Sequence, residues 1–455
     1  MIPLVFLLLS VNLVESSQCY WSDQCAYQKY SSKTPYEAVR GDIRDHNIPQ
    51  NCQAISIWSL NRHGNRNPGD SVTTDTKAIS GLRDQIVASY RAGTSQLCAQ
   101  DIENLIHWRW NETMDVSQSF LTGVGYEELY DIAKRLREKY PHLLEGTADD
   151  YYFRTTNEQR TITSAMAFVH GLTETTNLTL PVDGPWDRDD VIRPYENCDR
   201  YQKEVKGGAG QTAQMDAYYR SHEYVTVVAN VQRRLGITTN LSTDDVYSLY
   251  ELCRFYRSWE PTLKSPWCSV FSNEDLVILE YHDDVRHYHR NGYGSEVNVN
   301  LGGPALKDLY ESIEAAVSGT GKLVKAYFTH DTMIEMAICA MGLYKDDFVI
   351  EGSLRREHRR WRTSEIGCFS SNILAVLNRC DVQGEEIHRV QLFVNENPTE
   401  LCPLEGCSWK QFRDLFQRFV AANLTFCAME DRTTPGGASA AGTSSLIIGA
   451  GLALA

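Results

Sequence analysis

The sequence has no excess of basic residues. Its 44 lysines and arginines are outnumbered by 59 aspartates and glutamates, which gives a formal net charge of −15. Binding to a nucleic-acid backbone requires a basic face, so this balance argues against nucleic acid as a partner. A small polyanionic substrate is compatible with it only where arginines cluster locally.

The sequence also has no Cys-x-x-Cys pair with the spacing of a zinc site, although it contains 13 cysteines. The cysteines are therefore expected to form disulfides, and their odd number leaves at least one thiol free or bonded to another chain. Four Asn-x-Ser/Thr sequons accompany them, at Asn111, Asn177, Asn240 and Asn423. An oxidising secretory compartment explains both features without a metal.

Neither end of the chain reaches the roughly 20 apolar residues of a transmembrane helix. The N-terminal apolar run gives way to small residues, which predicts a signal peptide over residues 1–16, with a buried helix as the alternative. Residues 435–455 run from small residues through a polar spacer to an apolar tail, which is typical of a GPI-attachment signal. A disordered tail is the alternative there. We therefore expect a lipid-anchored protein on the cell surface, and otherwise a secreted or luminal one.

A chain of 455 residues with 42% hydrophobic residues and no internal repeat is expected to form one large domain with an insertion, or two domains. Residues 54–60, 151–153, 323–328 and 390–394 have the composition or alternation of strands. Apolar residues recur at helical spacing over 125–140, and residues 161–172 form a second helical stretch. Alternating strands and helices predict an α/β fold with a central mixed sheet flanked by helices.

Residues 177–298 lose this strand pattern and carry helical stretches and glycine punctuation. They predict a mostly helical cap, inserted between core segments 17–176 and 299–434.

The strongest local signal is the heptapeptide Arg62-His63-Gly64-Asn65-Arg66-Asn67-Pro68. Guanidinium groups can donate paired hydrogen bonds to the oxygens of a phosphate group. A neutral histidine between two arginines can then attack the phosphorus atom. His330 and Asp331 follow a second apparent strand, so both motifs fall where open α/β sheets place their ligands. An exposed basic loop is the alternative for the heptapeptide alone.

These residues resemble a known family. The heptapeptide is similar to the R-H-G-x-R-x-P signature of the histidine acid phosphatases, in branch 2 of the histidine phosphatases, and residues 121–125 and 154–161 resemble two further segments of that family. Residues 195–198, 264–268, 290–294 and 340–346 resemble the multiple inositol polyphosphate phosphatases. The resemblance runs from about residue 52 to 395 and implies the histidine phosphatase fold, also found in phosphoglycerate mutases.

The resemblance implies a role for each matching residue. His63 is the expected nucleophile, and Asp331 is the expected proton donor to the leaving alcohol. The expected phosphate ligands are Arg62, Arg66, Arg154 and His330. Arg160 is the alternative to Arg154, which is preferred because it directly follows a strand. No cofactor is implied, since the clustered cations stabilise the transition state themselves.

One position departs from the pattern. Vertebrate inositol polyphosphate phosphatases have a glutamate two residues after the histidine, whereas here Asp331 is adjacent and Thr332 stands at the glutamate's place. The adjacent His-Asp pair is instead the arrangement found in the other acid phosphatases and phytases. The resemblance therefore does not imply which position of the inositol ring is dephosphorylated.

The expected substrates are phytate and lower inositol phosphates, and such polyanions need cations beyond the catalytic group. The candidates for these contacts are Lys77, Arg359 and Arg362. A general acid phosphatase for small monoesters and a catalytically silent surface protein are the alternatives. The oligomeric state is not indicated.

Overall fold

The computed structural model describes residues 19–24, 26–260 and 264–429. The predicted signal peptide and GPI-attachment signal lie outside this range and stay predictions. Within it, none of the helices combines the length and hydrophobicity that a membrane crossing requires.

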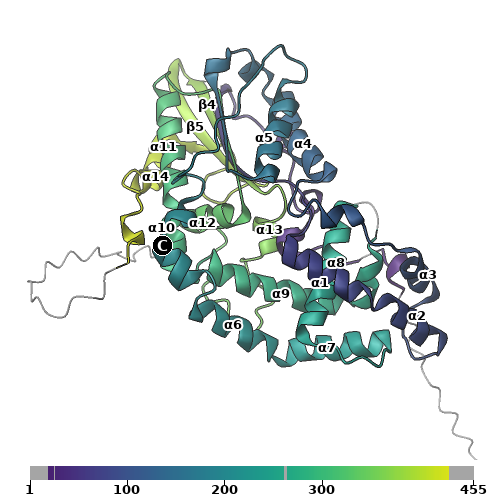
Figure 1. Ribbon diagram of the computed structural model, residues 1–455. Coiled ribbons are helices and arrows are strands. Elements are labelled where there is room, and N and C mark those ends of the chain that lie inside the picture. Colours follow the sequence, from purple (N-terminus) through teal and green to yellow (C-terminus); the bar gives the residue numbers. More distant parts are fainter. Residues whose placement is uncertain (1–18, 25, 261–263, 430–455) are drawn as a thin grey trace, which may run out of the picture.

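A mixed sheet forms the centre of the fold (Figure 1). Its strand order is β2-β3-β1-β4-β5-β6, and β7 pairs with β5. The first three of these run parallel to one another, while β4 and β5 are antiparallel to their neighbours. The strands are β1 (Cys52–Arg62), β2 (Tyr151–Thr155), β3 (Val324–Thr329), β4 (Asn372–Val382), β5 (Glu385–Val394), β6 (Asn397–Pro398) and β7 (Cys407–Ser408). All four predicted strands are therefore present in one sheet.

Helices cover both faces of the sheet, which confirms the predicted fold class. On one face, α4 (Gly123–Lys139) buries Leu129, Ala133 and Leu136 against α5 (Gln159–Thr173) and the strands. The other face packs against α11 (Gly303–Val317), α12 (Asp331–Met341) and α14 (Trp409–Phe416). The helical spacing read over residues 125–140 thus marks the face that α4 turns to the sheet.

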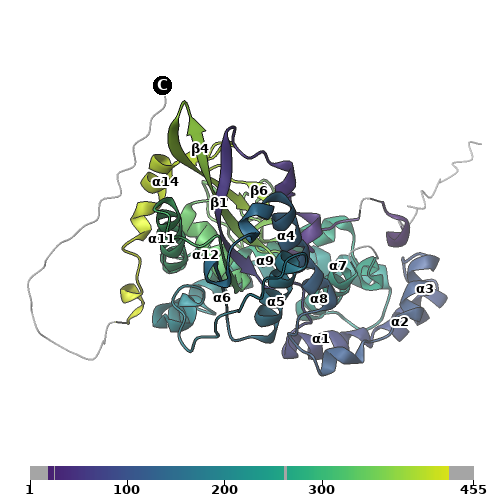
Figure 2. The ribbon, with the colours of Figure 1, turned by 90° about the horizontal axis from the view of Figure 1, so that it is seen from above.

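The helical cap is larger than the sequence predicts. Figures 1 and 2 show α1, α2 and α3 beside the helices of residues 177–298, and α1 packs on α8 while α2 packs on α7. Residues 70–107 therefore belong to the cap, although the sequence predicts that they are part of the core segment 17–176. Its helices are α1 (Asp70–Ser80), α2 (Arg83–Arg91), α3 (Ala99–His107), α6 (Ala209–Tyr219), α7 (His222–Leu235), α8 (Thr243–Trp259) and α9 (Asn273–Arg290). The short helices α10 (Glu296–Leu301) and α13 (Thr363–Ile366) complete the described set.

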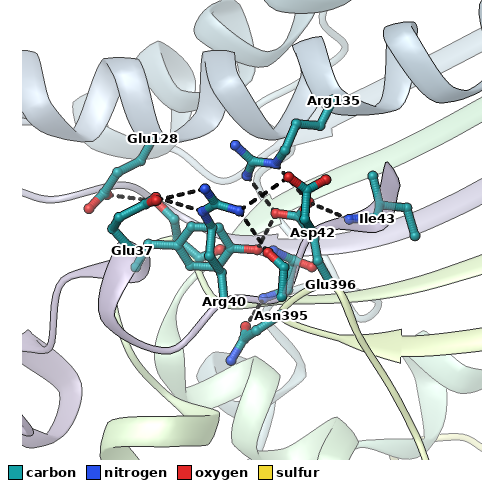
Figure 3. A network of polar contacts seen from close by, with 12 residues as sticks. Glu37, Arg40, Asp42, Ile43, Glu128, Arg135, Asn395 and Glu396 are labelled. Atoms are coloured by element: carbon teal, nitrogen blue, oxygen red, sulfur yellow. Dashed lines mark hydrogen bonds and ion pairs between the residues drawn. The ribbon is translucent and has the colours of Figure 1, made fainter. Parts of the chain in front are cut away.

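The segment before β1 is fixed to the core by a network of charges (Figure 3). Glu396, in the turn after β5, accepts hydrogen bonds from Arg135 of α4 at 2.8 and 2.5 Å and from the backbone of Ile43 at 3.2 Å. Arg40 pairs with Glu37 at 2.6 Å in the same network. The buried ion pair of Arg135 and Glu396 is rigid because both carboxylate oxygens of Glu396 have hydrogen-bond partners. The early segment is thereby held against the sheet.

Five disulfides are present among the described residues. They join Cys19 to Cys98, Cys52 to Cys380, Cys198 to Cys427, Cys253 to Cys268 and Cys402 to Cys407. Cys339 and Cys368 are buried and free, and Cys25 lies outside the described residues. The four sequon asparagines are all exposed, so each is accessible to a glycosyltransferase, and their glycosylation stays a prediction.

Candidate active site

Two neighbouring parallel strands bring the two histidine motifs together. Arg62 at the end of β1 lies opposite Thr329 at the end of β3, and the backbone N–H of His63 donates to the carbonyl of Thr329 at 3.0 Å. The ring centroids of His63 and His330 are consequently 5.6 Å apart. The carboxyl ends of both strands therefore open onto one site, as the sequence predicts.

His63 is buried and has the form of a nucleophile. Its Nδ1 lies 2.8 Å from the carbonyl oxygen of Gly64, so Nδ1 carries the proton and Nε2 keeps its lone pair. Burial, with the charges of Arg62 and Arg160, lowers the pKa of His63 well below 6.5. The imidazole is therefore neutral, which is the state that attacks phosphorus.

The loop that carries His63 rests on the start of α4. A Cβ atom on Gly64 would lie 2.1 Å from the carbonyl oxygen of Gly125, so the two segments approach too closely for any other residue. The hydroxyl of Thr122 caps α4 at the N–H of Gly125 and also bonds the carbonyl of Asn65 at 3.1 Å. Glu128 accepts the N–H of Asn65 at 2.8 Å. The loop geometry is thus fixed by α4 before a substrate binds.

Three guanidinium groups around His63 keep hydrogen-bond donors unused. Arg62 donates from Nη1 to the carbonyls of Ser32 and Gly367, at 2.6 and 2.7 Å. Its Nε and Nη2 make no hydrogen bond among the described residues, although Nη2 lies 3.4 Å from the carboxylate of Asp331. The Nε atoms of Arg66 and Arg160 are equally buried and unmatched there. Burial, with Arg160 and Arg62, lowers the pKa of Arg66 to about 9. Buried donors of this kind define an anion site.

The structure corrects the choice of Arg154 as the third arginine. Both Arg154 and Asp189 are buried, and they form an ion pair with Nε 3.1 Å from the carboxylate. The Arg154 guanidinium also stacks 4.0 Å from the ring of Trp186. Arg160 instead lies close enough to lower the pKa values of His63 and His330. We refer to Arg62, Arg66, Arg160 and His330 as the cationic cage.

His330 and Asp331 complete the group around His63. His330 Nε2 lies 3.1 Å from the hydroxyl of Thr156, and burial, with Arg160, lowers the pKa of His330 to about 3. Asp331 begins α12 and lies 3.4 Å from Nη2 of Arg62. Burial favours its neutral form, but Arg62, His287 and Lys33 outweigh burial and hold the pKa of Asp331 well below 3.8. In the free protein this carboxyl is therefore ionised.

The geometry agrees with the match to a family model. A model described as the histidine phosphatase superfamily (branch 2) matches residues 56–395. The chain belongs to this family. The matched range includes both histidine motifs and the whole sheet except the start of β1 and strands β6 and β7.

Relatives of this histidine phosphatase include enzymes from animals. Multiple inositol polyphosphate phosphatase 1 of Drosophila melanogaster is 30% identical over 443 residues, which cover 92% of each chain. The protein of the same name from Homo sapiens is 25% identical over 401 residues, 81% of each chain.

Solved structures share the fold. The phytase from D. castellii has a TM-score of 0.68 at 19% identity and covers 89% of this chain and 92% of its own. The multiple inositol polyphosphate phosphatase of Bifidobacterium longum, solved in complex with inositol hexasulfate, has a TM-score of 0.62 at 14% identity and covers 83% and 94%. Both likenesses concern the fold alone.

The basic residues expected to contact outer phosphates are engaged elsewhere in this histidine phosphatase. Arg359 is buried and pairs with Asp284 and Glu280, and Arg362 also pairs with Glu280. The structure therefore contradicts the prediction for both arginines, because acidic residues of α9 neutralise them. Lys77 is half exposed and pairs with Asp115 at 2.7 Å, so its charge is matched too.

Other charged residues near the cage were missed by the sequence argument. His287 and Lys33 shift the pKa of Asp331, and Arg193 shifts that of His330. Arg193 stands two residues before Tyr195, where a segment that resembles the multiple inositol polyphosphate phosphatases begins, so its nearness to that segment was a usable signal. Lys33 and His287 have no comparable motif around them.

Proposed function

We propose that this histidine phosphatase removes phosphate groups from inositol polyphosphates, namely phytate and lower inositol phosphates. The observation that carries the proposal is the neutral ring of His63 among three guanidinium groups with unused buried donors. The relatives named as multiple inositol polyphosphate phosphatases support this substrate class.

The reaction proceeds in two balanced steps. The lone pair of His63 Nε2 attacks phosphorus, the bond from phosphorus to the inositol oxygen breaks, and that oxygen takes a proton from Asp331. Arg62, Arg66 and Arg160 hold the oxygens of the transferred group. A water molecule then attacks the phosphohistidine, gives its proton to Asp331, and releases inorganic phosphate while His63 is restored.

Substrate binding accounts for the protonation of Asp331, which is ionised in the free protein. A phosphate dianion neutralises Arg62 and its neighbours, which removes the cause of the low pKa of Asp331. A phosphate monoester has its second pKa near about 6, so a substrate monoanion also brings a proton into the site.

The substrate class is tested against a general acid phosphatase. The purified chain should release phosphate from phytate in the presence of a chelator, with a kcat/KM well above that for an aryl phosphate. The reason is that a site with excess cations favours the more highly charged substrate. Equal values for the two substrates, or a preference for the aryl ester, would support the general acid phosphatase instead.

The pKa shifts predict an acidic pH dependence. His63 has a lowered pKa and stays neutral on acidification, whereas a histidine with a pKa of 6.5 would be protonated and unreactive. Asp331 has a pKa well below 3.8 and stays ionised in the free protein over this range, so the proton has to arrive with the substrate. We therefore expect kcat/KM to rise as the pH is lowered from about 7 to about 5, because the substrate monoanion gains population below its second pKa of about 6 while His63 stays neutral. A fall in kcat/KM through pH 6.5 on acidification would contradict these assignments.

We propose a location in the secretory pathway or at the cell surface, with a GPI anchor. Five disulfides and four exposed sequon asparagines support an oxidising compartment. Treating intact cells with a phosphatidylinositol-specific phospholipase should release the protein. Retention after treatment would exclude the anchor.

A further inference from the structure

A buried histidine and a buried glutamate form a pair behind the active site. His287 of α9 is 6% exposed and Glu335 of α12 is 0% exposed. The Nδ1 atom of His287 lies 2.9 and 3.0 Å from the two carboxylate oxygens of Glu335. The amide of Asn291 donates to the same carboxylate at 2.9 Å, and its oxygen accepts the hydroxyl of Tyr201 at 3.2 Å. The pair is therefore fixed in one orientation.

The burial of Glu335 favours a positive charge on His287. A carboxylate is costly to bury unless a cation pairs with it. The ion pairs of the described residues give Glu335 one such partner, which is His287. An ionised carboxylate only accepts hydrogen bonds, so Nδ1 of His287 is the donor between the two side chains. An imidazolium at position 287 therefore satisfies the buried carboxylate.

The Glu335 carboxylate is a close neighbour of the proton donor. Asp331 is the first residue of α12 and Glu335 is the fifth, so the two side chains share one side of the helix. A Cβ atom on Gly367 would lie 2.3 Å from a carboxylate oxygen of Glu335, so Glu335 packs against this glycine. The carbonyl of Gly367 accepts a hydrogen bond from Arg62 at 2.7 Å, and Arg62 lies 3.4 Å from Asp331. These contacts place the pair directly beside Asp331.

We propose that His287, oriented by Glu335, is a positioning residue whose positive charge favours the ionised form of Asp331 and thereby confines the turnover of inositol phosphates to acidic pH. The inference rests on the proposed function, in which Asp331 is the proton donor. His287 acts through Asp331 and not on the phosphate group itself.

Asp331 faces cations from several parts of the fold. They are Arg62, His63 and Arg66 of β1 and the loop after it, Arg160 of α5, Lys33 of the 3-10 helix η2 (Ser31–Lys33) and His287. Burial raises the pKa of Asp331, and Arg62, followed by His287, opposes burial most strongly. The transferred phosphate neutralises Arg62, whereas His287 is paired with Glu335. The charge of His287 therefore still acts on Asp331 in the substrate complex.

Fewer titratable groups face His287. Glu335 and Asp331 lie on α12, and Tyr201 is joined to Glu335 through Asn291. Glu365 of α13, the short helix that packs on α9, is engaged by Lys29 at 2.6 Å. Glu335 is thus the anion that holds the charge of His287, and Asp331 is the group on which this charge acts.

Removal of the charge should move the pH profile of turnover. In His287→Gln the amide can still donate to Glu335, but the positive charge beside Asp331 is lost. The protonated form of Asp331 then persists to higher pH. We expect the pH at which kcat for phytate falls to rise by about one unit, the lower end of the effect of a nearby opposite charge. Because kcat reports groups in the substrate complex, the profile is measured at saturating phytate from about pH 4 to about pH 8.

Two further variants separate charge from packing. His287→Lys keeps a positive charge next to Glu335 and should keep the midpoint of the wild-type profile. His289→Gln is the matched control, because His289 also lies on α9 but is bonded to the carbonyl of Ile350 at 2.8 Å. It should keep the wild-type midpoint too. A variant that is less completely folded loses kcat by the same factor at every pH, so the midpoint reports the charge independently of stability.

The outcomes distinguish this inference from the proposed function. An unchanged midpoint in His287→Gln, or an equal shift in His287→Lys or His289→Gln, would overturn the role of His287. A wild type that does not hydrolyse phytate at any pH would contradict the proposed function itself.

Discussion

Replacement of His63 by alanine should lower phosphate release from phytate by about 10⁴-fold or more, the loss expected when a covalent nucleophile is removed. The cage would still bind substrate in this variant, since Arg62, Arg66 and Arg160 do not depend on the imidazole for their positions. The KM or the inhibition constant of a competing phosphate should therefore change much less than kcat. Steady-state kinetics with phytate measures both quantities.

His107→Ala serves as the control for this variant. His107 lies at the end of α3 with its side chain 71% exposed, far from the strands that carry the site. Its replacement should leave kcat at the wild-type level. A His63→Ala protein that is folded and retains a substantial part of the wild-type kcat would exclude His63 as the nucleophile. Absence of any activity in the wild type would favour the silent surface protein instead.

The second large effect separates two arginines that lie six residues apart in the sequence. Arg160→Ala should lower kcat/KM about 10²- to 10³-fold, as for other preorganised donors that stabilise transition-state charge, with little change in Tm. Arg154→Ala should instead lower the stability of the fold and leave catalysis nearly unchanged. It leaves Asp189 buried without its ion-pair partner and should destabilise the fold by about 3 kcal/mol, while kcat stays close to that of the wild type.

Thermal unfolding and kinetics of both variants decide between the assignments. If Arg154→Ala lost most of kcat at unchanged stability, Arg154 would belong to the cage in the substrate complex. If Arg160→Ala were active and unstable, the two roles would be exchanged.

The central sheet and the two histidine motifs were predictable because their signals are contiguous in the sequence. A strand pattern followed directly by Arg62-His63-Gly64, and a second one followed by His330, determine which side chains stand at the carboxyl edge of the sheet. Only the parallel pairing of β1 and β3 had to be assumed for the two motifs to meet. The family resemblance supplied the roles of these residues.

The choice between Arg154 and Arg160 could not be made from the sequence. Arg154 lies within β2, where successive side chains point to opposite faces, and its side chain is directed to Asp189. Arg160 is the second residue of α5, and only three residues separate the end of β2 from that helix. The short connection returns the start of α5 to the site, which the spacing along the chain does not indicate.

The outer charges were unpredictable for a different reason. Arg359 and Arg362 look available in the sequence because their acidic partners, Glu280 and Asp284, lie some 75 to 82 positions earlier in α9. Lys33 stands in an ordinary polar segment, and only the tertiary fold brings it beside Arg66 and Phe255. Charge pairing over such distances is a property of the folded chain.

The most direct test of the account is to trap the covalent intermediate. The wild-type protein is mixed briefly with radiolabelled phytate, denatured in alkali, and digested. We predict an acid-labile, alkali-stable label on the peptide that contains His63, and no label in His63→Ala. Label on another residue, or full turnover by a wild type that never becomes labelled, would contradict phosphoryl transfer through His63.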